Sequence, residues 1–441
     1  MRGGVLAGVV VALALCAAST AGADDPDPTL YCVGDGGPLG AATAAEHTVL
    51  VGDPKLPAGV RERRISVKGV RTRITEAGPP GADEAVVFLH GNPGSARDWD
   101  DLVAANGRFA RTVAIDVPGW GKSEKTHTTT QNTDGAAAFV QGVLDTLGIK
   151  RMVLVGHDFG GIWGLQWASQ HPAALEGAVL IDTGVLKDYT PHPTAIAWAT
   201  PVVGETLVAS TTRQSFHQAV QYMQPRPLPD AFVDRMYDDY DRLTRCALLR
   251  YYRSVRDATV PNSNALADKQ IAALRGRRRP ALVIWGAKDP YIPAEQAYKQ
   301  RAAFPDAQVH VFPDSGHWSF VDNAAMTRAF VVPFLRPKLR AGRPAGVRLG
   351  ARRLRVAVRV TGVLAAQQVS ARLDGGAAST PLAVTGRRTL SLRLRKPLLA
   401  GKHVVTVQAF GLPKRSLRFR VAARSRPKPP PPRRSGPDFT G

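Results

Sequence analysis

The chain has 441 residues, of which 44% are hydrophobic and 21% charged, a composition that is typical of folded domains and excludes a fibre or a largely disordered protein. It is longer than the roughly 250 to 300 residues at which a single core stops growing, so we expect more than one domain. The formal net charge is +22, but 25 of the 58 Lys and Arg residues follow Leu335, with only Asp374 and Asp438 among them. The first three quarters of the chain are therefore nearly neutral and need not bind whatever the basic end binds.

Residues 1–23 predict a signal peptide. Arg2 precedes an apolar run, and Ala21 to Ala23 supply the small residues that a signal peptidase reads. The run is shorter than the ~20 residues of a membrane span, and Cys16 lacks the small preceding residue of a lipid-attachment site. We expect a secreted or envelope-associated protein with no transmembrane segment in the mature chain, which begins with an N-terminal segment over residues 24–63.

Two cysteines, Cys32 and Cys246, remain after removal of the signal peptide. An oxidising compartment would allow them to form a disulfide. The alternative is an exposed Cys32 near the terminus and an unrelated Cys246 buried in a helix, and the sequence leaves both open.

The region from Arg64 to residue 336 predicts an α/β fold. Short apolar runs rich in β-branched residues alternate with helical stretches, which is typical of a mostly parallel sheet with helices on both faces. This alternation of strands and helices stops over residues 187–279, which indicates a helical lid between core parts 64–186 and 280–336. Such an insertion would lie over the carboxyl ends of the strands, where ligands bind, although a plain helical extension is the alternative. The predicted strand sequences are EAVVFLH, RTVAIDV, RMVLVGH, GAVLID, PALVIWG and AQVHVF.

The basic end divides into two parts. Residues 345–423 alternate apolar and basic positions between turn signals, which predicts a small all-β sandwich-like domain with arginines on its solvated face. Residues 424–441 are rich in proline and predict a disordered tail. An exported basic domain would meet an anionic cell-envelope polymer, which we expect as a partner; an arginine-rich surface without a partner is the alternative. Nucleic acid is not expected, because the only aromatic residues for base stacking are Phe410, Phe419 and Phe439.

The segment Gly156-His157-Asp158-Phe159-Gly160 is the strongest local signal. It follows a predicted buried strand and precedes a helix, and its glycines allow a sharp reversal that presents the Asp158 side chain at the edge of the sheet. We expect Asp158 to be a nucleophile, although it could have a structural role.

Its expected partners follow in the order of a catalytic triad. Asp289 ends a later strand and His317 lies in the loop after the last strand, so they are the predicted acid and base. The backbone amides of Asn92 and Phe159 would form an oxyanion hole. Asp182 also ends a strand and is a rival to Asp289 for the role of the acid.

These segments resemble the α/β-hydrolase superfamily, and the aspartate at the elbow is similar to the branch of epoxide hydrolases and haloalkane dehalogenases. The resemblance covers roughly Arg64 to Leu335 and leaves out the signal peptide, the basic domain and the tail. It implies a small apolar substrate whose saturated carbon is attacked by Asp158, followed by hydrolysis of the resulting ester by water that His317 activates. The matching motifs are HGNPGSARDW, DVPGWGKS, GHDFGG, WGAKDPYIP and SGHWSF.

The leaving group separates the two branches. Epoxide hydrolases protonate an alkoxide with lid tyrosines, and the segment LLRYYRSVRD resembles the one that carries such a residue, at Tyr252. The second tyrosine would be Tyr189 or Tyr222. Haloalkane dehalogenases use N–H donors, of which Asn92 matches the pattern, but Phe159 stands where a tryptophan is usual and offers no N–H. We therefore expect epoxide hydrolysis, with haloalkane dehalogenation as the alternative.

Other interpretations remain beside these. A non-catalytic scaffold that binds a ligand and is anchored to the envelope is an alternative of another class. The sequence suggests no metal or nucleotide cofactor. His90 and His157 are expected to be structural, as are four tryptophans, which we interpret as packing residues: Trp99, Trp120, Trp163 and Trp167.

Overall fold

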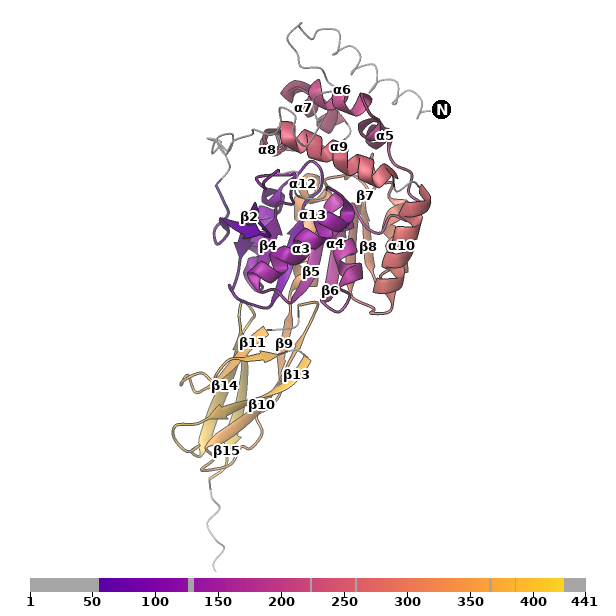
Figure 1. Ribbon diagram of the computed structural model, residues 1–441. Coiled ribbons are helices and arrows are strands. Elements are labelled where there is room, and N and C mark those ends of the chain that lie inside the picture. Colours follow the sequence, from indigo (N-terminus) through magenta and orange to yellow (C-terminus); the bar gives the residue numbers. More distant parts are fainter. Residues whose placement is uncertain are drawn as a thin grey trace, which may run out of the picture. The chain divides into compact units, whose positions relative to one another are not determined.

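The computed structural model describes residues 55–125, 131–222, 224–257, 260–364, 367–384 and 386–423. The predicted signal peptide, most of the N-terminal segment and the tail lie outside these residues. The chain divides into two compact units, Met1–Pro337 with Gly362–Leu364, and Lys338–Thr361 with Ala365–Gly441 (Figure 1).

The first unit contains an eight-stranded sheet, which confirms the predicted α/β architecture. The strand order is β1-β2-β4-β3-β5-β6-β7-β8. β1 and β2 form an antiparallel pair and β2 is antiparallel to β4, whereas all pairs from β4 through β8 are parallel. The strands are β1 (Arg61–Val67), β2 (Val70–Ala77), β3 (Glu84–Leu89), β4 (Thr112–Ile115), β5 (Arg151–His157), β6 (Leu175–Ile181), β7 (Ala281–Gly286) and β8 (Gln308–Phe312).

Helices cover both faces of this sheet. On β3, Phe88 contacts the Trp99 ring at 5.6 Å, whereas Val87 and Leu89 belong to the cluster that contains residues of α3 and α4. Because successive side chains of a strand point to opposite faces, these two sets of helices lie on opposite sides. The core helices are η4 (Ala96–Trp99), α2 (Asp100–Gly107), α3 (Thr133–Leu147), α4 (Phe159–Gln170), α10 (Val260–Arg275), α11 (Glu295–Lys299), η5 (Gln300–Ala302), α12 (Ser319–Asp322) and α13 (Ala324–Leu335).

The predicted insertion 187–279 contains a group of helices that we call the cap. Figure 1 shows α5 to α9 gathered at one end of the strands, whereas α10 runs beside the sheet. The Gln270 amide of α10 donates to Gln166 of α4 at 2.9 Å, so α10 packs as part of the core. The cap helices are α5 (Pro193–Ala199), α6 (Val203–Ala209), α7 (Arg213–Tyr222), α8 (Asp230–Asp239) and α9 (Arg242–Asp257).

Two sequence-based expectations concern the surroundings of this unit. Cys246 on α9 is buried and disulfide-bonded. Its proposed partner Cys32 lies outside the described residues, so that pairing stays a prediction. None of the helices in the described ranges has the length and apolar character needed to cross a membrane.

The second unit consists of two antiparallel sheets, as the alternating pattern predicts. Their strand orders are β13-β10-β9 and β12-β11-β14-β15. The predicted start at residue 345 is wrong, because Lys338 already begins a strand that pairs with Thr361. That strand is only four residues long, too short for its alternation to stand out. The strands are β9 (Lys338–Ala341), β10 (Arg353–Thr361), β11 (Gln367–Leu373), β12 (Leu382–Val384), β13 (Gly386–Arg393), β14 (Gly401–Ala409) and β15 (Arg415–Val421).

A buried arginine joins the sheet to the cap. Arg73 on β2 is 2% exposed, and its Nε donates to Asp116 at 2.7 Å, while its Nη2 lies 3.8 Å from Asp239 of α8. Burial opposes its charge, but the carboxylates of Asp116 and Asp239 outweigh burial and raise the pKa of Arg73 above its ordinary value. Asp116 also accepts the Ala96 and Lys122 amides, so one charged cluster fixes the loops beneath α8.

We predict that Arg73→Met lowers the free energy of unfolding by about 3 to 5 kcal/mol, because it leaves the buried Asp116 carboxylate without its cation, whereas Asp239 keeps Lys122. Urea unfolding followed by tryptophan fluorescence measures this, since all seven tryptophans precede Pro337 and report the first unit. Arg61→Met is the control, because this exposed arginine lies 3.5 Å from the buried Glu76, which keeps Arg63 as its closer partner, and the change should alter stability by at most about 1 kcal/mol. Equal losses in the two variants would contradict the structural role of Arg73.

Candidate active site

Asp158 lies on a strained turn between β5 and α4. Its backbone has φ 48° and ψ −125°, a conformation that side chains rarely adopt. The turn brings the chain so close to β3 that a Cβ on Gly160 would lie 2.1 Å from the Leu89 carbonyl oxygen. The Thr183 hydroxyl donates to the Asp158 carbonyl at 2.5 Å and helps to hold this conformation. The predicted elbow is therefore present.

The Asp158 carboxylate is surrounded by donors. The backbone amide of Asn92 donates to Oδ1 at 2.8 Å, and Nε2 of His317 lies 3.6 Å from Oδ2. Burial on its own would raise the pKa of Asp158, but the neighbouring His317 and the Phe159 amide outweigh burial and lower the pKa. The carboxylate is therefore ionised at neutral pH, as a nucleophile must be.

His317 is held from its other side by Asp289. Its Nδ1 lies 2.9 Å from Oδ2 of Asp289, and Oδ1 of Asp289 accepts the Tyr291 and Ile292 amides at 2.8 and 3.0 Å. Burial lowers the pKa of His317, but the charges of Asp289 and Asp158 dominate and raise it well above its ordinary value. The three side chains predicted as nucleophile, base and acid thus lie in one row.

Asp182, the rival acid, lies beside this row and contacts other groups. Its Oδ1 accepts the Gly286 amide at 2.6 Å, and the Ser319 hydroxyl donates to its Oδ2 at 2.5 Å. Burial and the charge of Asp289 raise the pKa of Asp182 well above its ordinary value. Of the two acids, Asp289 is the one that contacts His317.

The two neighbouring histidines connect backbone segments. Nε2 of His157 donates to the His317 carbonyl at 2.9 Å, and burial is the main reason that the pKa of His157 is lowered to about 3, so the ring is neutral. Nε2 of His90 accepts the Val117 amide at 3.1 Å, which places the proton on Nδ1, where it is donated to the Gly91 carbonyl at 2.8 Å. Neither ring contacts the Asp158 carboxylate through a hydrogen bond, which is consistent with a structural role.

Trp120 does more than pack. Its Nε1 donates to Oδ1 of Asn92 at 3.0 Å, which fixes the orientation of the Asn92 amide. Nδ2 of Asn92 is buried and makes no hydrogen bond of ordinary geometry in the described part of the chain. The Asn92 side chain lowers the pKa of the Tyr252 hydroxyl, which indicates that the two groups are close. In the sequence, the only indication of this contact was the tryptophan within the DVPGWGKS motif.

Tyr252 of α9 packs against Phe159, the residue that follows Asp158. Its ring centroid is 5.2 Å from that of Phe159 and 5.1 Å from that of Trp198. Burial, followed by the negative charge of Asp158, raises the pKa of Tyr252 well above its ordinary value, so its hydroxyl keeps its proton. The predicted lid tyrosine and the predicted nucleophile therefore share one site.

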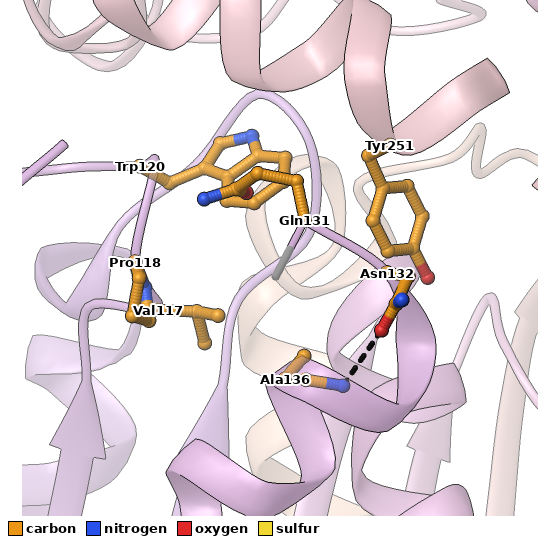
Figure 2. Close-up of a pocket in the computed structure, with 8 residues that line it drawn as sticks. Val117, Pro118, Trp120, Gln131, Asn132, Ala136 and Tyr251 are labelled. Atoms are coloured by element: carbon orange, nitrogen blue, oxygen red, sulfur yellow. Dashed lines mark hydrogen bonds between the residues drawn. The ribbon is translucent and has the colours of Figure 1, made fainter. Parts of the chain in front are cut away.

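The ring of its neighbour Tyr251 also packs on Phe159, with the centroids 4.4 Å apart, but its hydroxyl is directed elsewhere. The Tyr251 hydroxyl is 3.1 Å from the Thr133 hydroxyl at the start of α3. Figure 2 shows Tyr251 and Trp120 at a small pocket beside the N-terminal turn of α3. The rings of both residues thus contact Phe159, whereas the Tyr251 hydroxyl is engaged at the start of α3.

Of the two candidates for a second tyrosine, only Tyr189 is near the site. Tyr222 is 77% exposed. Tyr189 is half-buried, its hydroxyl donates to the Tyr291 carbonyl at 3.2 Å, and the charges of Asp158 and Asp289 add to burial in raising its pKa. Tyr222 therefore cannot serve this site in the described conformation.

Two aromatic residues near the site were missed from the sequence. The Tyr291 ring lies 4.9 Å from that of His317, and the His192 ring lies 4.9 Å from that of Tyr291. Nδ1 of His192 accepts the Ala195 amide at 3.2 Å, and the pKa of His192 is lowered to about 4, chiefly by burial. His192 is therefore neutral and carries its proton on Nε2. The only local signals were the PHP sequence at the start of the cap and the position of Tyr291 two residues after Asp289.

Comparison with known proteins follows from this geometry. A family profile described as alpha/beta hydrolase fold matches residues 84–324, more than half of the chain. The chain belongs to the α/β-hydrolase fold family. Within the described residues, no group of three or more His, Cys, Asp or Glu side chains is arranged to hold a metal ion in this α/β-hydrolase.

Curated relatives of this α/β-hydrolase are themselves hydrolases. The chain is 31% identical over 264 residues to 2-hydroxy-6-oxononadienedioate/2-hydroxy-6-oxononatrienedioate hydrolase of Burkholderia vietnamiensis, which covers 58% of this chain and 88% of the relative. It is 27% identical over 283 residues to 2-hydroxy-6-oxo-6-phenylhexa-2,4-dienoate hydrolase of Burkholderia cepacia, covering 62% and 94%.

Solved structures show the same fold. The Cif epoxide hydrolase from Acinetobacter nosocomialis has a TM-score of 0.56 and 19% identity, with 64% of this chain and 91% of that one covered. The haloalkane dehalogenase DatA from Agrobacterium tumefaciens C58 has a TM-score of 0.53 and 20% identity, with 63% and 96% covered. At these identities the likeness supports the α/β-hydrolase fold and not a substrate.

We predict that Asp158→Asn lowers the pKa of His317 by about 1 to 3, because it removes one of the two carboxylates that favour the imidazolium. Titration of the histidine ring signals by NMR measures this without any substrate. Asp306→Asn is the control, since this exposed carboxylate pairs with Arg278 and is not among the groups that act on His317, so its replacement should leave the pKa of His317 nearly unchanged. Equal falls in both variants, or none in Asp158→Asn, would contradict the assigned charges.

Proposed function

We propose that this α/β-hydrolase is exported and opens epoxides through an ester formed on Asp158. The observation that carries the proposal is the ionised Asp158 carboxylate, which lies between the Asn92 amide and the His317–Asp289 pair. A carboxylate that attacks an acyl carbon gives an anhydride, whereas attack on a saturated carbon gives an ester that water can cleave. An aspartate nucleophile therefore favours a substrate with an electrophilic saturated carbon.

In the first step, an Asp158 oxygen forms a bond to one ring carbon of the epoxide, and the bond between that carbon and the ring oxygen breaks. The ring oxygen leaves as an alkoxide and takes a proton from a nearby acid. Tyr252 fits this role because its raised pKa keeps the hydroxyl protonated and the side-chain amide of Asn92 lies beside that hydroxyl. Tyr189 is the second candidate donor, although its hydroxyl first has to leave the Tyr291 carbonyl.

In the second step, Asp158 is an uncharged ester. His317 then loses one of the carboxylates that raise its pKa, so the imidazolium gives its proton to the phenolate that the first step left on Tyr252 and becomes a neutral base. It takes a proton from water, whose oxygen adds to the ester carbonyl of Asp158. The backbone amides of Asn92 and Phe159 stabilise the resulting oxyanion. Its collapse breaks the bond to the alcohol oxygen, which takes the proton from His317 and leaves as the diol, and the acid formed on Asp158 then gives its proton to His317 and is again a carboxylate.

The curated relatives suggest another reaction. Their names describe hydrolysis of 6-oxo acids, in which a carbonyl carbon is the electrophile. An attacking Asp158 would form an anhydride with such a carbon, so the aspartate favours the epoxide over the reaction of these relatives.

Haloalkane dehalogenation is the second candidate. The observation in its favour is Nδ2 of Asn92, a buried N–H donor without a hydrogen bond of ordinary geometry in the described residues, which could hold a leaving halide. Phe159 supplies no side-chain donor beside it. A halide site with one such donor is weaker support than the tyrosines offer to an epoxide oxygen.

We predict that His317→Gln forms the Asp158 ester but hydrolyses it slowly. After incubation with styrene oxide, intact-mass spectrometry should show one added substrate mass, while steady turnover falls by roughly 10⁴-fold, the size of effect typical of a disabled catalytic group. Asp158→Asn should show neither turnover nor added mass, because it lacks the nucleophile.

His310→Gln is the matched control, because this histidine stacks on Phe330 beside β8 and has no contact with the site. It should turn over normally without accumulating the ester. An unmodified His317→Gln protein together with a fully active Asp158→Asn would rule out the covalent mechanism.

We predict that Tyr252→Phe lowers diol formation by about 10²- to 10⁴-fold, the usual contribution of a general acid, and that Tyr251→Phe has a much smaller effect. The assay measures diol from styrene oxide and free bromide from a panel of bromoalkanes. Bromide release that is independent of Tyr252, without any diol, would favour the dehalogenase instead. Tight ligand binding without either product would favour a non-catalytic scaffold.

A further inference from the structure

One face of the three-stranded sheet in the second unit is strongly basic. On β10, the residues Leu354, Val356, Val358 and Val360 are buried, so the alternate positions form the outer face. We call the basic residues of this surface the arginine face. All of its members are exposed: Lys338, Arg340, Arg353, Arg355, Arg359, Arg387 and Arg393.

Strand pairing brings several of these charges directly opposite one another. Arg359 of β10 pairs with Arg340 of β9 on one side and with Arg387 of β13 on the other, so three arginines form one row. Arg353 pairs with Arg393 further along the same strands. Neighbouring strands are only about 4.8 Å apart, and like charges directly opposite one another destabilise a sheet. The row is therefore unfavourable for the stability of the sheet alone.

No acid in the described part of the unit compensates for this charge. Asp374 is the only acidic residue there, and it lies on the other sheet, where it contacts Nδ1 of His403 at 2.7 Å and accepts the Val404 amide at 2.8 Å. None of the seven side chains of the arginine face forms an ion pair within the described ranges. An anion from outside would relieve the repulsion that the pairing creates.

The dimensions of the face favour an extended anion over a small one. From Arg353 to Arg359 the face extends about 20 Å along β10, and the three-arginine row crosses about 10 Å of sheet, by the usual strand geometry. A single phosphate can neutralise one end only, whereas a chain of phosphates can reach both. Arginine side chains bind phosphate through two parallel hydrogen bonds, and the exposed hydroxyls of Thr389 and Ser391 add further donors to the same face.

The surroundings of the face disfavour nucleic acid. The aromatic residues of the described part of this unit are Phe410, just after β14, and Phe419 on β15, and both belong to the other sheet. The arginine face therefore offers no stacking platform for bases. Its complement is a polymer whose repeating group is a phosphate and whose linking units have no rings to stack.

We propose that the arginine face binds a linear polyol phosphate of the cell envelope, and that this binding is independent of the hydrolase site. The phosphodiester repeats supply charge at intervals that several arginines can share, and the exposed face along β10 is long enough for an extended chain. The proposal goes beyond the proposed hydrolysis and stands without it, because no residue of the first unit takes part.

The test measures binding of the full-length protein to immobilised poly(glycerol phosphate) over a salt series. In Arg340→Gln/Arg359→Gln/Arg387→Gln, we expect affinity at low salt to fall by at least about tenfold. The slope of log affinity against log salt should fall by about 2 to 3, since each neutralised phosphate contributes roughly 0.7 to 0.9. The matched control is Arg372→Gln/Arg418→Gln/Arg420→Gln, which removes the same charge from exposed positions on the other sheet and should retain most of the affinity.

Two further measurements keep the result interpretable. Arg340→Lys/Arg359→Lys/Arg387→Lys keeps the charge but loses the paired hydrogen bonds, so it should bind more weakly with a similar salt slope. The thermal unfolding temperature of the glutamine variant should equal or exceed that of the natural chain, because repulsion has been removed, and this excludes misfolding as the cause of lost binding.

Several outcomes would overturn the proposal. Equal losses in the two glutamine triples would mean that net charge acts without a defined face. Competition by pyrophosphate as effective as competition by the polymer would exclude an extended site. Retention on DNA or on phosphatidylglycerol vesicles, with none on poly(glycerol phosphate), would identify a different partner.

Discussion

The charge relation between Asp158 and His317 is the constraint on which the rest of the first unit depends. Two opposite charges lie 3.6 Å apart in a buried setting, and burial alone would suppress both of them. They persist because Asp289 stabilises the imidazolium and backbone amides stabilise the carboxylate. Each of those groups must be held in place, and the strained elbow, the close approach to β3 and the loop after β7 all serve this purpose.

The second charged cluster, around Arg73, has a different role. It lies at the edge of the sheet where β2 meets the cap, and it connects a strand, the loop after β4 and α8. The cap is therefore held by the Arg73 ion pairs on one side and by aromatic contacts with Phe159 on the other. Both sets of contacts hold the cap against the core beside Asp158.

The sequence predicted those parts of the site that depend on local chain geometry. Asp158 could be found because glycines at an elbow leave a visible pattern, and Asp289 and His317 because strand ends meet at one edge of a parallel sheet. His192 and Tyr291 could not, since ring packing across the cap and the core leaves no periodic trace. The contact between Trp120 and Asn92 was likewise hidden, and Tyr222 shows the converse, as exposure decided against a residue that sequence position allowed. The same limit applied to β9, whose four residues are identified by their pairing with β10 and not by their own pattern.

The neighbouring positions of Tyr251 and Tyr252 on α9 restrict how the cap can change. Each residue of a helix advances by about 100° around its axis, so two adjacent side chains face different surroundings. An insertion of one residue before this pair would bring Tyr251 to the place that Tyr252 occupies, whereas a deletion would bring Arg253 there. Length changes in this cap should therefore be tolerated in the connections between helices and excluded from the first half of α9, where they would change which side chain packs beside Asp158.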